Sequence, residues 1–156
     1  MEKEFLSFIQ ENIGIIYKII LMYSNTNEYR EDLKQEIIYQ LWKSYPSFNH
    51  QSLFTTFMYR VSLNTAINYY KKENKNKYES IDLYCNSMDA TPVKHRELEA
   101  FYAAIYLLTP VEKAIIFYYL EGFDYSEISL KTNLSEGNIR VKMYRIKEKL
   151  KNILNT

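Results

Sequence analysis

The sequence contains few residues that cross-link a chain, break a helix or shift its net charge. Its 156 residues include one cysteine, three glycines and three prolines, and the formal net charge is +1. Because Cys85 stands alone, it offers neither a disulfide framework nor a cluster of thiolate metal ligands, which suits a reducing cytoplasm. Scarce glycine and proline leave little turn chemistry. The composition therefore favours a nearly all-helical fold, and we expect an all-α protein.

The chain also lacks a long hydrophobic run. The apolar stretch 13–23 is interrupted by Lys18, and it is well short of the roughly 20 residues that a membrane-spanning helix needs. The opening residues, from Met1 to Glu4, do not have the pattern of a signal peptide. We therefore expect a soluble, cytoplasmic protein with no membrane insertion.

The net charge does not favour a protein that binds DNA tightly by itself, and the histidines do not suggest a metal site. Twenty basic residues are balanced by 19 acidic ones, whereas non-specific DNA affinity comes mainly from neutralising phosphates. The two histidines, His50 and His95, have no partners at metal-ligand spacing. We expect no metal and no cofactor, and a DNA-binding role would need a partner that supplies much of the affinity.

A helix-turn-helix pattern is present near the end of the sequence. Asp124 and Glu127 have the spacing of a capping box, in which each side chain satisfies a free backbone N–H of the first helical turn. A turn is expected at 132–134, before Ser135 caps a second helix with Asn138 at its third position. The apolar residues of that second helix recur at spacings of three and four, at Ile139, Met143, Ile146, Leu150 and Ile153.

The opposite face of the second helix is basic. Between Ser135 and Lys151, six basic residues face two acidic ones, a local excess of four. A solvated basic helix in a bundle would share this charge but not the paired caps, so we favour a recognition helix that enters a DNA major groove. The candidate DNA contacts are Ser135, Asn138, Arg140, Val141, Lys142, Tyr144 and Arg145.

Apolar periodicity predicts three earlier helices, over about 5–23, 28–44 and 53–74, with a proline-containing loop between the last two. Trp42 is expected in the core. Periodicity disappears over 76–92, where Asn, Ser, Asp, Thr and Pro dominate, and this segment is interpreted as a flexible linker.

Two further helices are expected before the helix-turn-helix, one up to Leu108 and one from Pro110 to a stop at Gly122. Their predicted core positions are Leu98, Phe101, Ile105, Leu108, Val111, Ile115, Tyr118 or Tyr119, and Leu120. The expected organisation is therefore two small helical domains, 1–75 and 93–156, joined by the linker.

Three blocks of the sequence resemble bacterial sigma factors. Residues 31–42, with Asp-Leu-x-Gln-Glu followed by Leu-Trp, resemble the acidic polymerase-binding helix of that family. Residues 54–69 look like the next helix, which reads promoter DNA near the minus-ten element. Leu108-Thr-Pro and residues 121–128 and 135–142 look like the domain for the minus-thirty-five element. The blocks follow the family order, and with only two domains the chain resembles the extracytoplasmic-function group of the sigma-70 family.

The resemblance implies partners and roles for particular residues. The partners are core RNA polymerase and promoter DNA, both as a duplex and as the melted non-template strand; whether an anti-sigma factor exists stays open. The implied polymerase-binding residues are Asp32, Leu33, Gln35 and Glu36. The implied DNA-binding residues of the first domain are Phe48, Asn49, Gln51, Tyr59, Arg60, Asn64, Lys71 and Lys72. The segment 46–53 corresponds to a family loop that holds a base flipped from the non-template strand. Val141 replaces a usual small hydroxyl residue and offers methyl groups to a thymine.

Two other classes of protein remain as alternatives. A helix-turn-helix regulator with an N-terminal oligomerisation domain would bind duplex operator DNA without polymerase, and the acidic block at 31–36 argues against it. A DNA-cutting enzyme could use one of the 16 tyrosines as a nucleophile, but none is accompanied by clustered His, Arg or paired carboxylates. We expect a sigma factor that is not an enzyme.

Overall fold

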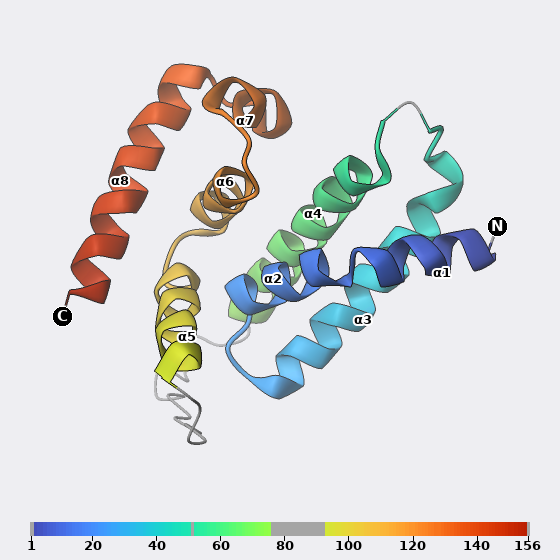
Figure 1. Cartoon of the computed structure of the whole chain (residues 1–156), viewed down its shortest axis with the longest axis horizontal. Coiled ribbons are helices and arrows are strands. Elements are labelled where there is room, and N and C mark those ends of the chain that lie inside the picture. Colours follow the sequence, from blue (N-terminus) through green and yellow to red (C-terminus); the bar gives the residue numbers. More distant parts are fainter. Residues whose placement is uncertain (1, 51, 76–92, 156) are drawn as a thin grey trace. The chain divides into compact units, whose positions relative to one another are not determined.

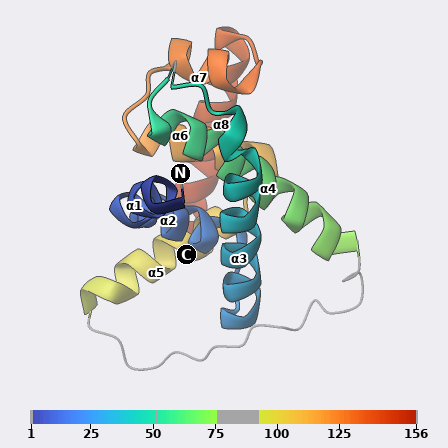
Figure 2. The same ribbon diagram turned by 90° about the vertical axis from the view of Figure 1, so that its right-hand side faces the viewer.

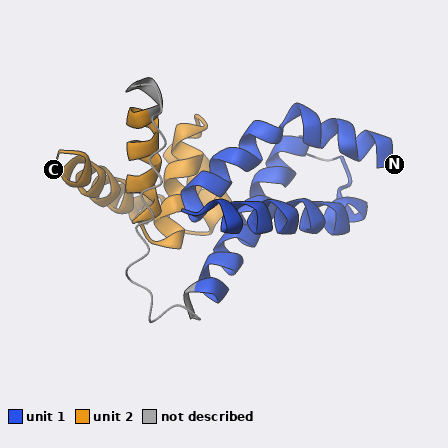
Figure 3. Cartoon of the chain, turned by 90° about the horizontal axis from the view of Figure 1, so that it is seen from below, with its two compact units in different colours: residues 1–83 blue, residues 84–156 orange. Residues whose placement is uncertain are grey.

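The computed structural model describes residues 2–50, 52–75 and 93–155, over which helices joined by short turns and loops are the only regular secondary structure (Figure 1). The expected all-α class is confirmed. The chain divides into two compact units, Met1–Leu83 and Tyr84–Thr156 (Figure 3). The segment predicted as a linker, 76–92, lies outside the described residues.

The first unit is built on a long helix pair. It contains α1 (Glu2–Glu11), α2 (Ile13–Tyr23), α3 (Asn27–Ser44), the 3-10 helix η1 (Tyr45–Ser47) and α4 (Phe54–Lys75). Helix α3 lies along α4, and α2 packs against both (Figures 1 and 2). Completely buried side chains from the three helices form the core, among them Ile16, Ile19, Leu33, Ile37, Leu41 and Met58.

The predicted single helix over 5–23 is wrong, because the chain breaks at Asn12. The side chain of Asn12 donates a hydrogen bond to the carbonyl of Phe8 at 2.9 Å, and its backbone leaves the helical region with ψ at 20°. Asparagine side chains compete in this way with the helical backbone. Helices α1 and α2 are consequently bent by 63°. Over the described ranges no single helix is long and apolar enough to cross a membrane. Taken together, the bent pair α1 and α2 would be, by length and composition only.

The aromatic residue at the end of α3 is less buried than expected. Trp42 is 43% exposed, so its predicted place in the core is wrong. Its ring meets the edge of Phe5 on α1, with 5.0 Å between the centroids. The indole therefore leans on the core from outside while one side stays open to solvent.

The second unit contains α5 (Val93–Tyr106), α6 (Pro110–Leu120), α7 (Tyr125–Thr132) and α8 (Glu136–Leu154). Helix α6 begins as predicted: Pro110 occupies its first turn, and Thr109 forms a capping box with Glu112. It ends at Leu120, and Gly122 follows the C-cap residue Glu121 with a φ of 97°, which is strained for any residue with a β-carbon. Helix α8 packs against α5, α6 and α7.

Three predicted core positions of this unit are wrong. Leu98 lies in the stretch 96–100 of α5, in which every residue is exposed; the buried residues of α5 come later in the helix, at Ala104 and Ile105. Val111 and Leu120 lie at the two ends of α6 and are 42% and 51% exposed. The intervening residues 112–118 are all buried, so more than one face of α6 is covered and its apolar spacing does not select a single stripe.

Candidate nucleic-acid interface

The helix-turn-helix forms through the local contacts that its sequence predicts. The Asp124 carboxylate accepts a hydrogen bond from the Glu127 backbone at 2.8 Å, and Glu127 accepts one in return from the Asp124 backbone at 3.3 Å. Asn133 turns the chain in the left-handed conformation with φ at 60°. The Ser135 hydroxyl then accepts from the Asn138 backbone at 3.1 Å and starts α8. These caps fix where the outward residues of α8 point.

Helix α8 has a buried face and an exposed face, as predicted. Ile139, Met143 and Ile146 are completely buried. The exposed face holds the candidate DNA contacts Ser135, Asn138, Arg140, Val141, Tyr144 and Arg145, with Lys142 half-buried beside them.

The exposed face of α8 carries a weak ion pair. Arg140 pairs with Glu136 at 3.0 Å, but both side chains are largely exposed, and such pairs contribute little to stability. Arg140 can therefore exchange Glu136 for a phosphate or a base at small cost.

Two of the lysines that give α8 its basic excess interact with side chains of α6 in the same unit. The Lys149 ammonium donates to both carboxylate oxygens of Glu112 at 2.8 and 3.0 Å. The Lys147 ammonium lies 4.9 Å from the ring centroid of Tyr119. These contacts fasten α8 to α6 and engage Lys147 and Lys149 within the unit, whereas Arg140, Arg145 and Lys151 stay exposed on α8. Nothing in the local sequence signals these long-range pairs.

Glu112 and its neighbour Lys113 respond differently to burial. Burial by itself would raise the pKa of Glu112, but hydrogen bonds from Lys149 and Thr109 outweigh it and hold that pKa below the usual value of 4.5. Lys113 is completely buried, with its ammonium 4.4 Å from the ring centroid of Tyr106. Burial lowers the pKa of Lys113 to about 7. The sequence alone did not reveal this buried lysine.

In the first unit, α3 presents part of the predicted polymerase-binding set. Asp32 and Gln35 are exposed and Glu36 is partly exposed. Leu33 is completely buried, in line with Ile37 on the core stripe of α3. The role of Leu33 as a surface contact is therefore corrected: it packs the helix, and the polar residues beside it form the surface.

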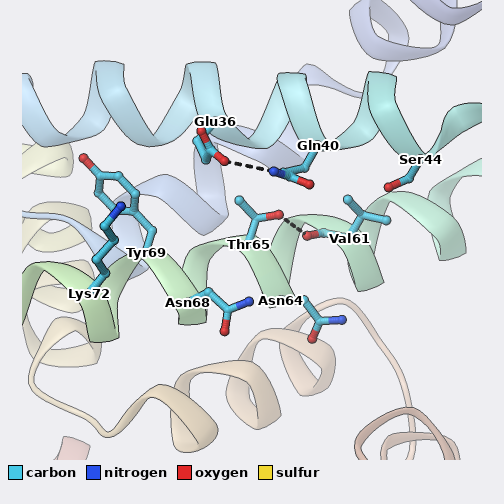
Figure 4. Close-up of a pocket in the computed structure, with 9 residues that line it drawn as sticks. All are labelled: Glu36, Gln40, Ser44, Val61, Asn64, Thr65, Asn68, Tyr69 and Lys72. Atoms are coloured by element: carbon cyan, nitrogen blue, oxygen red, sulfur yellow. Dashed lines mark hydrogen bonds between the residues drawn. The ribbon is translucent and has the colours of Figure 1, made fainter.

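An open pocket of about 460 Å³ lies between α3 and α4 (Figure 4). Glu36 lines it from α3, where its carboxylate accepts a hydrogen bond from Gln40 at 3.0 Å. Asn64 and Lys72 line it from α4, and Figure 4 shows Asn64 directed away from α3. Predicted polymerase-binding and DNA-binding residues thus border the same pocket.

Tyr69, at one end of this pocket, has an acidic environment. Burial, followed by the charges of Glu73, Asp32 and Glu36 among others, raises the pKa of Tyr69 to about 12. The phenol therefore remains a neutral hydrogen-bond donor at physiological pH. The acidic end of the pocket repels phosphate, whereas Lys72 attracts it.

The remaining candidate DNA contacts are spread over the loop and α4. Asn49, Arg60, Asn64, Lys71 and Lys72 are exposed, Phe48 and Tyr59 are half-buried, and Gln51 lies outside the described residues. Arg60, Asn64 and Lys71 follow helical spacing along α4, so the helix brings them to one side, whereas Lys72 extends toward α3 (Figure 4). Among the residues that the structure describes, no group of three or more His, Cys, Asp or Glu could hold a metal ion.

Two helical units, the second a capped helix-turn-helix with an exposed basic helix, define a helical DNA-binding protein. Comparison with protein families is more specific. Residues 8–76 match the model of sigma-70 region 2, and residues 98–150 match that of sigma-70, region 4. The chain belongs to the sigma-70 family of RNA polymerase sigma factors, in its extracytoplasmic-function group. Its function is that of a sigma factor, which directs core RNA polymerase to promoters. That family is not a class of enzymes.

Individual relatives agree with this assignment. The chain is 25% identical over 146 residues to the ECF RNA polymerase sigma factor SigM of Bacillus subtilis, covering 90% of this chain and 88% of that protein. It is also 25% identical over 136 residues to the ECF RNA polymerase sigma-E factor of Haemophilus influenzae, covering 78% and 72% of the two chains.

Two solved structures share the fold. One is the sigma factor RpoE of Bartonella quintana, crystallised with the anti-sigma factor NepR; it has a TM-score of 0.70 and 19% identity, over 96% of this chain and 98% of that one. The other is CnrH in complex with the cytosolic domain of CnrY, with a TM-score of 0.69 and 14% identity over 99% and 90% of the two chains. At these identities the likeness concerns the fold alone.

Proposed function

We propose that Asp32, Gln35 and Glu36 on α3 form the surface that binds core RNA polymerase. Support comes from the exposure of Asp32 and Gln35 and the partial exposure of Glu36, on a helix whose inner residues, such as Leu33, are fixed in the core. A surface on a rigid helix loses little conformational entropy on binding. The acidic side chains favour a basic partner surface. In this proposal the chain is not itself a catalyst and acts in the cytoplasm.

The second part of the proposal assigns promoter reading to two places. Helix α8 enters the major groove at the minus-thirty-five element with Arg140, Lys142 and Arg145, which lie near its capped N-terminus, whereas Lys147 and Lys149 contact α6. The loop after η1, together with α4, reads the minus-ten element. The same proposal includes two domains, 1–75 and 93–156, each of which reads one promoter element, with residues 76–92 as the linker between them.

At the minus-ten element we propose that the loop traps an unstacked base, to which Asn49, Gln51 and Asn64 offer amide groups. Extruding a base costs a few kcal/mol, and stacking it on an aromatic ring returns about 1 to 3 kcal/mol. The loop alone therefore cannot open a duplex. Polymerase has to supply the difference, which agrees with the small net charge of the chain.

An anti-sigma factor is a further proposed partner. The support is that the RpoE relative was crystallised with one. Copurification of this chain from its own cells would reveal whether such a protein exists.

Run-off transcription with purified core RNA polymerase tests the proposed function. Polymerase with the full chain should start at defined sites on promoters selected from a random DNA library, and polymerase alone should not. Tight duplex binding by the chain without polymerase, together with no stimulated initiation, would instead indicate a helix-turn-helix regulator.

A further inference from the structure

The loop that follows η1 is supported by a continuous cluster of aromatic rings. Phe8 on α1 stacks on Phe54 of α4, with 4.6 Å between centroids and 18° between planes. Phe54 in turn contacts Tyr45 of η1 and Phe57 of α4. Tyr45, Phe54 and Phe57 are all buried. The loop therefore lies against a fixed aromatic base.

Phe48 belongs to this cluster more than to the surface. Its ring centroid lies 6.1 Å from that of Tyr45, 5.8 Å from Phe54 and 5.2 Å from Phe57, and the side chain is half-buried. These three neighbours leave less of the Phe48 ring open to a DNA base than an exposed ring would offer. The expected role of Phe48 as the stacking face is therefore poorly matched to its position.

His50 is placed differently. Its side chain is exposed, and its ring lies 4.6 Å from that of Phe48 at an angle of 56°. Its backbone has a φ of 59°, the left-handed conformation that few residues with a side chain adopt. The unusual backbone and the contact with Phe48 together hold an imidazole ring outward on an anchored loop.

We propose that His50 is the ring that stacks on the trapped promoter base, and that Phe48 is a positioning residue that supports His50 from the side of the core. This inference rests on the proposed base-trapping function and assigns its stacking residue. Imidazole has a flat aromatic face for the base, as well as ring nitrogens that can hydrogen-bond to a base edge or phosphate. Asn49, next to it in the loop, remains a polar contact.

The test compares two substitutions of His50 in the full chain bound to core polymerase. His50→Asn removes the ring but keeps a residue that tolerates positive φ, and His50→Phe keeps a ring without the nitrogens. Binding is measured on selected promoters in two forms, as duplex and with the minus-ten region permanently unpaired. We expect His50→Asn to weaken binding to the unpaired form by about tenfold, and His50→Phe to retain most of it.

Phe48→Leu, made alone and together with His50→Asn, tests the supporting role. If Phe48 acts through His50, Phe48→Leu should weaken binding in the parent but cost little more once the His50 ring is absent. A variant that merely unfolds would lose binding in both backgrounds and would melt early by circular dichroism.

Two outcomes would overturn the inference. One is parental affinity of His50→Asn for the unpaired promoter; the other is an equal extra loss from Phe48→Leu with and without the His50 ring. Failure of the proposed function itself would look different, because the parental protein with polymerase would then neither start transcription nor prefer the unpaired promoter.

Discussion

The carboxylate of Glu112 joins the start of α6 to the far half of α8 by accepting two hydrogen bonds from the ammonium of Lys149, at 2.8 and 3.0 Å. The same carboxylate also accepts from the Thr109 backbone at 2.9 Å and so closes the capping box of α6. One buried side chain thus caps one helix and anchors another. This arrangement adds a polar contact to the packing of α8 against α6.

Lys149→Met should destabilise the protein by about 1 kcal/mol at neutral pH, a modest value because Lys149 is half exposed. Since the pKa of Glu112 is lowered on folding, the stabilisation is present above its unfolded value of 4.5 and is lost as the pH falls through the lower folded value. Urea unfolding of parent and variant between neutral and acidic pH checks this. Lys151→Met is the control. A stability difference between parent and Lys149→Met that is constant with pH would contradict the role of the Glu112 carboxylate.

Lys113→Met should stabilise the protein by on the order of 2 kcal/mol at pH 6, because it removes a buried charge. The folded pKa of Lys113, about 7, lies below the usual 10.5. Between these values the unfolded state binds more protons, so parental stability should rise with pH across that window, and the rise should be smaller in the variant. Denaturant unfolding from pH 6 to 10 measures both slopes. Equal pH slopes of the unfolding free energy in parent and variant would mean that the Lys113 ammonium is hydrated in the folded state.

Changing Asp32, Gln35 and Glu36 together to alanine should weaken binding to core polymerase by about tenfold or more. These side chains lie off the buried stripe of α3, so helical content and melting temperature should stay close to the parent. The control is Glu97→Ala with Glu99→Ala, which removes the same number of carboxylates from the exposed part of α5. The measurement is a pull-down beside circular dichroism. Unchanged pull-down of the folded triple variant would refute the assignment of α3.

Substitutions in α8 should separate base reading from charge. If Arg140 or Arg145 contacts a guanine with two hydrogen bonds, its change to alanine should cost about 1 to 3 kcal/mol and relax preference at one base pair. Lys142→Ala should weaken all sequences similarly and reduce the salt dependence, as expected for a phosphate contact. Titrations of polymerase-bound protein on variant promoters at several salt concentrations distinguish these effects, with Lys151→Ala as the control. Equal, sequence-independent losses from all three changes would leave α8 a purely electrostatic role.

Changing Asn49, Gln51 and Asn64 to alanine should slow promoter melting while leaving initial duplex binding nearly unchanged, because amides hold the base only after it leaves the stack. A fluorescent base analogue at the trapped position should brighten more slowly than with the parent. Exposed amides elsewhere in the first unit, Gln10, Asn25 and Asn27, provide a matched triple control. Parental opening rates in the loop variant would make the loop a simple connector.

The sequence predicted what depends on near neighbours along the chain. The Asp124–Glu127 capping box, the Ser135 cap and the turn at Asn133 are all formed, since each requires only residues a few positions apart. The buried stripe of α8 followed from helical periodicity for the same reason. The three blocks that resemble sigma factors, in the family order, were sufficient to predict the function.

Features that depend on distant residues were missed. One local feature was missed as well: the apolar spacing of 5–23 continues across Asn12, so it could not reveal the bend that the contact of Asn12 with Phe8 produces. The neighbours of Phe48 come from α4 and η1 as well as from the loop, and the partner of Lys149 is 37 residues away. Periodicity identifies a buried face without telling which element covers it, and this limit left Lys113 and the exposed side of Trp42 unrecognised.

Trp42 is the only tryptophan of the chain, and it stands at the end of α3 against Phe5. Indole emission consequently comes from the first unit alone, whereas circular dichroism at helical wavelengths records both units. Melting curves followed by the two signals would coincide if the units unfold together and separate if each unfolds on its own. Since the indole is 43% exposed, the same emission also responds to any change in how far solvent reaches the end of α3.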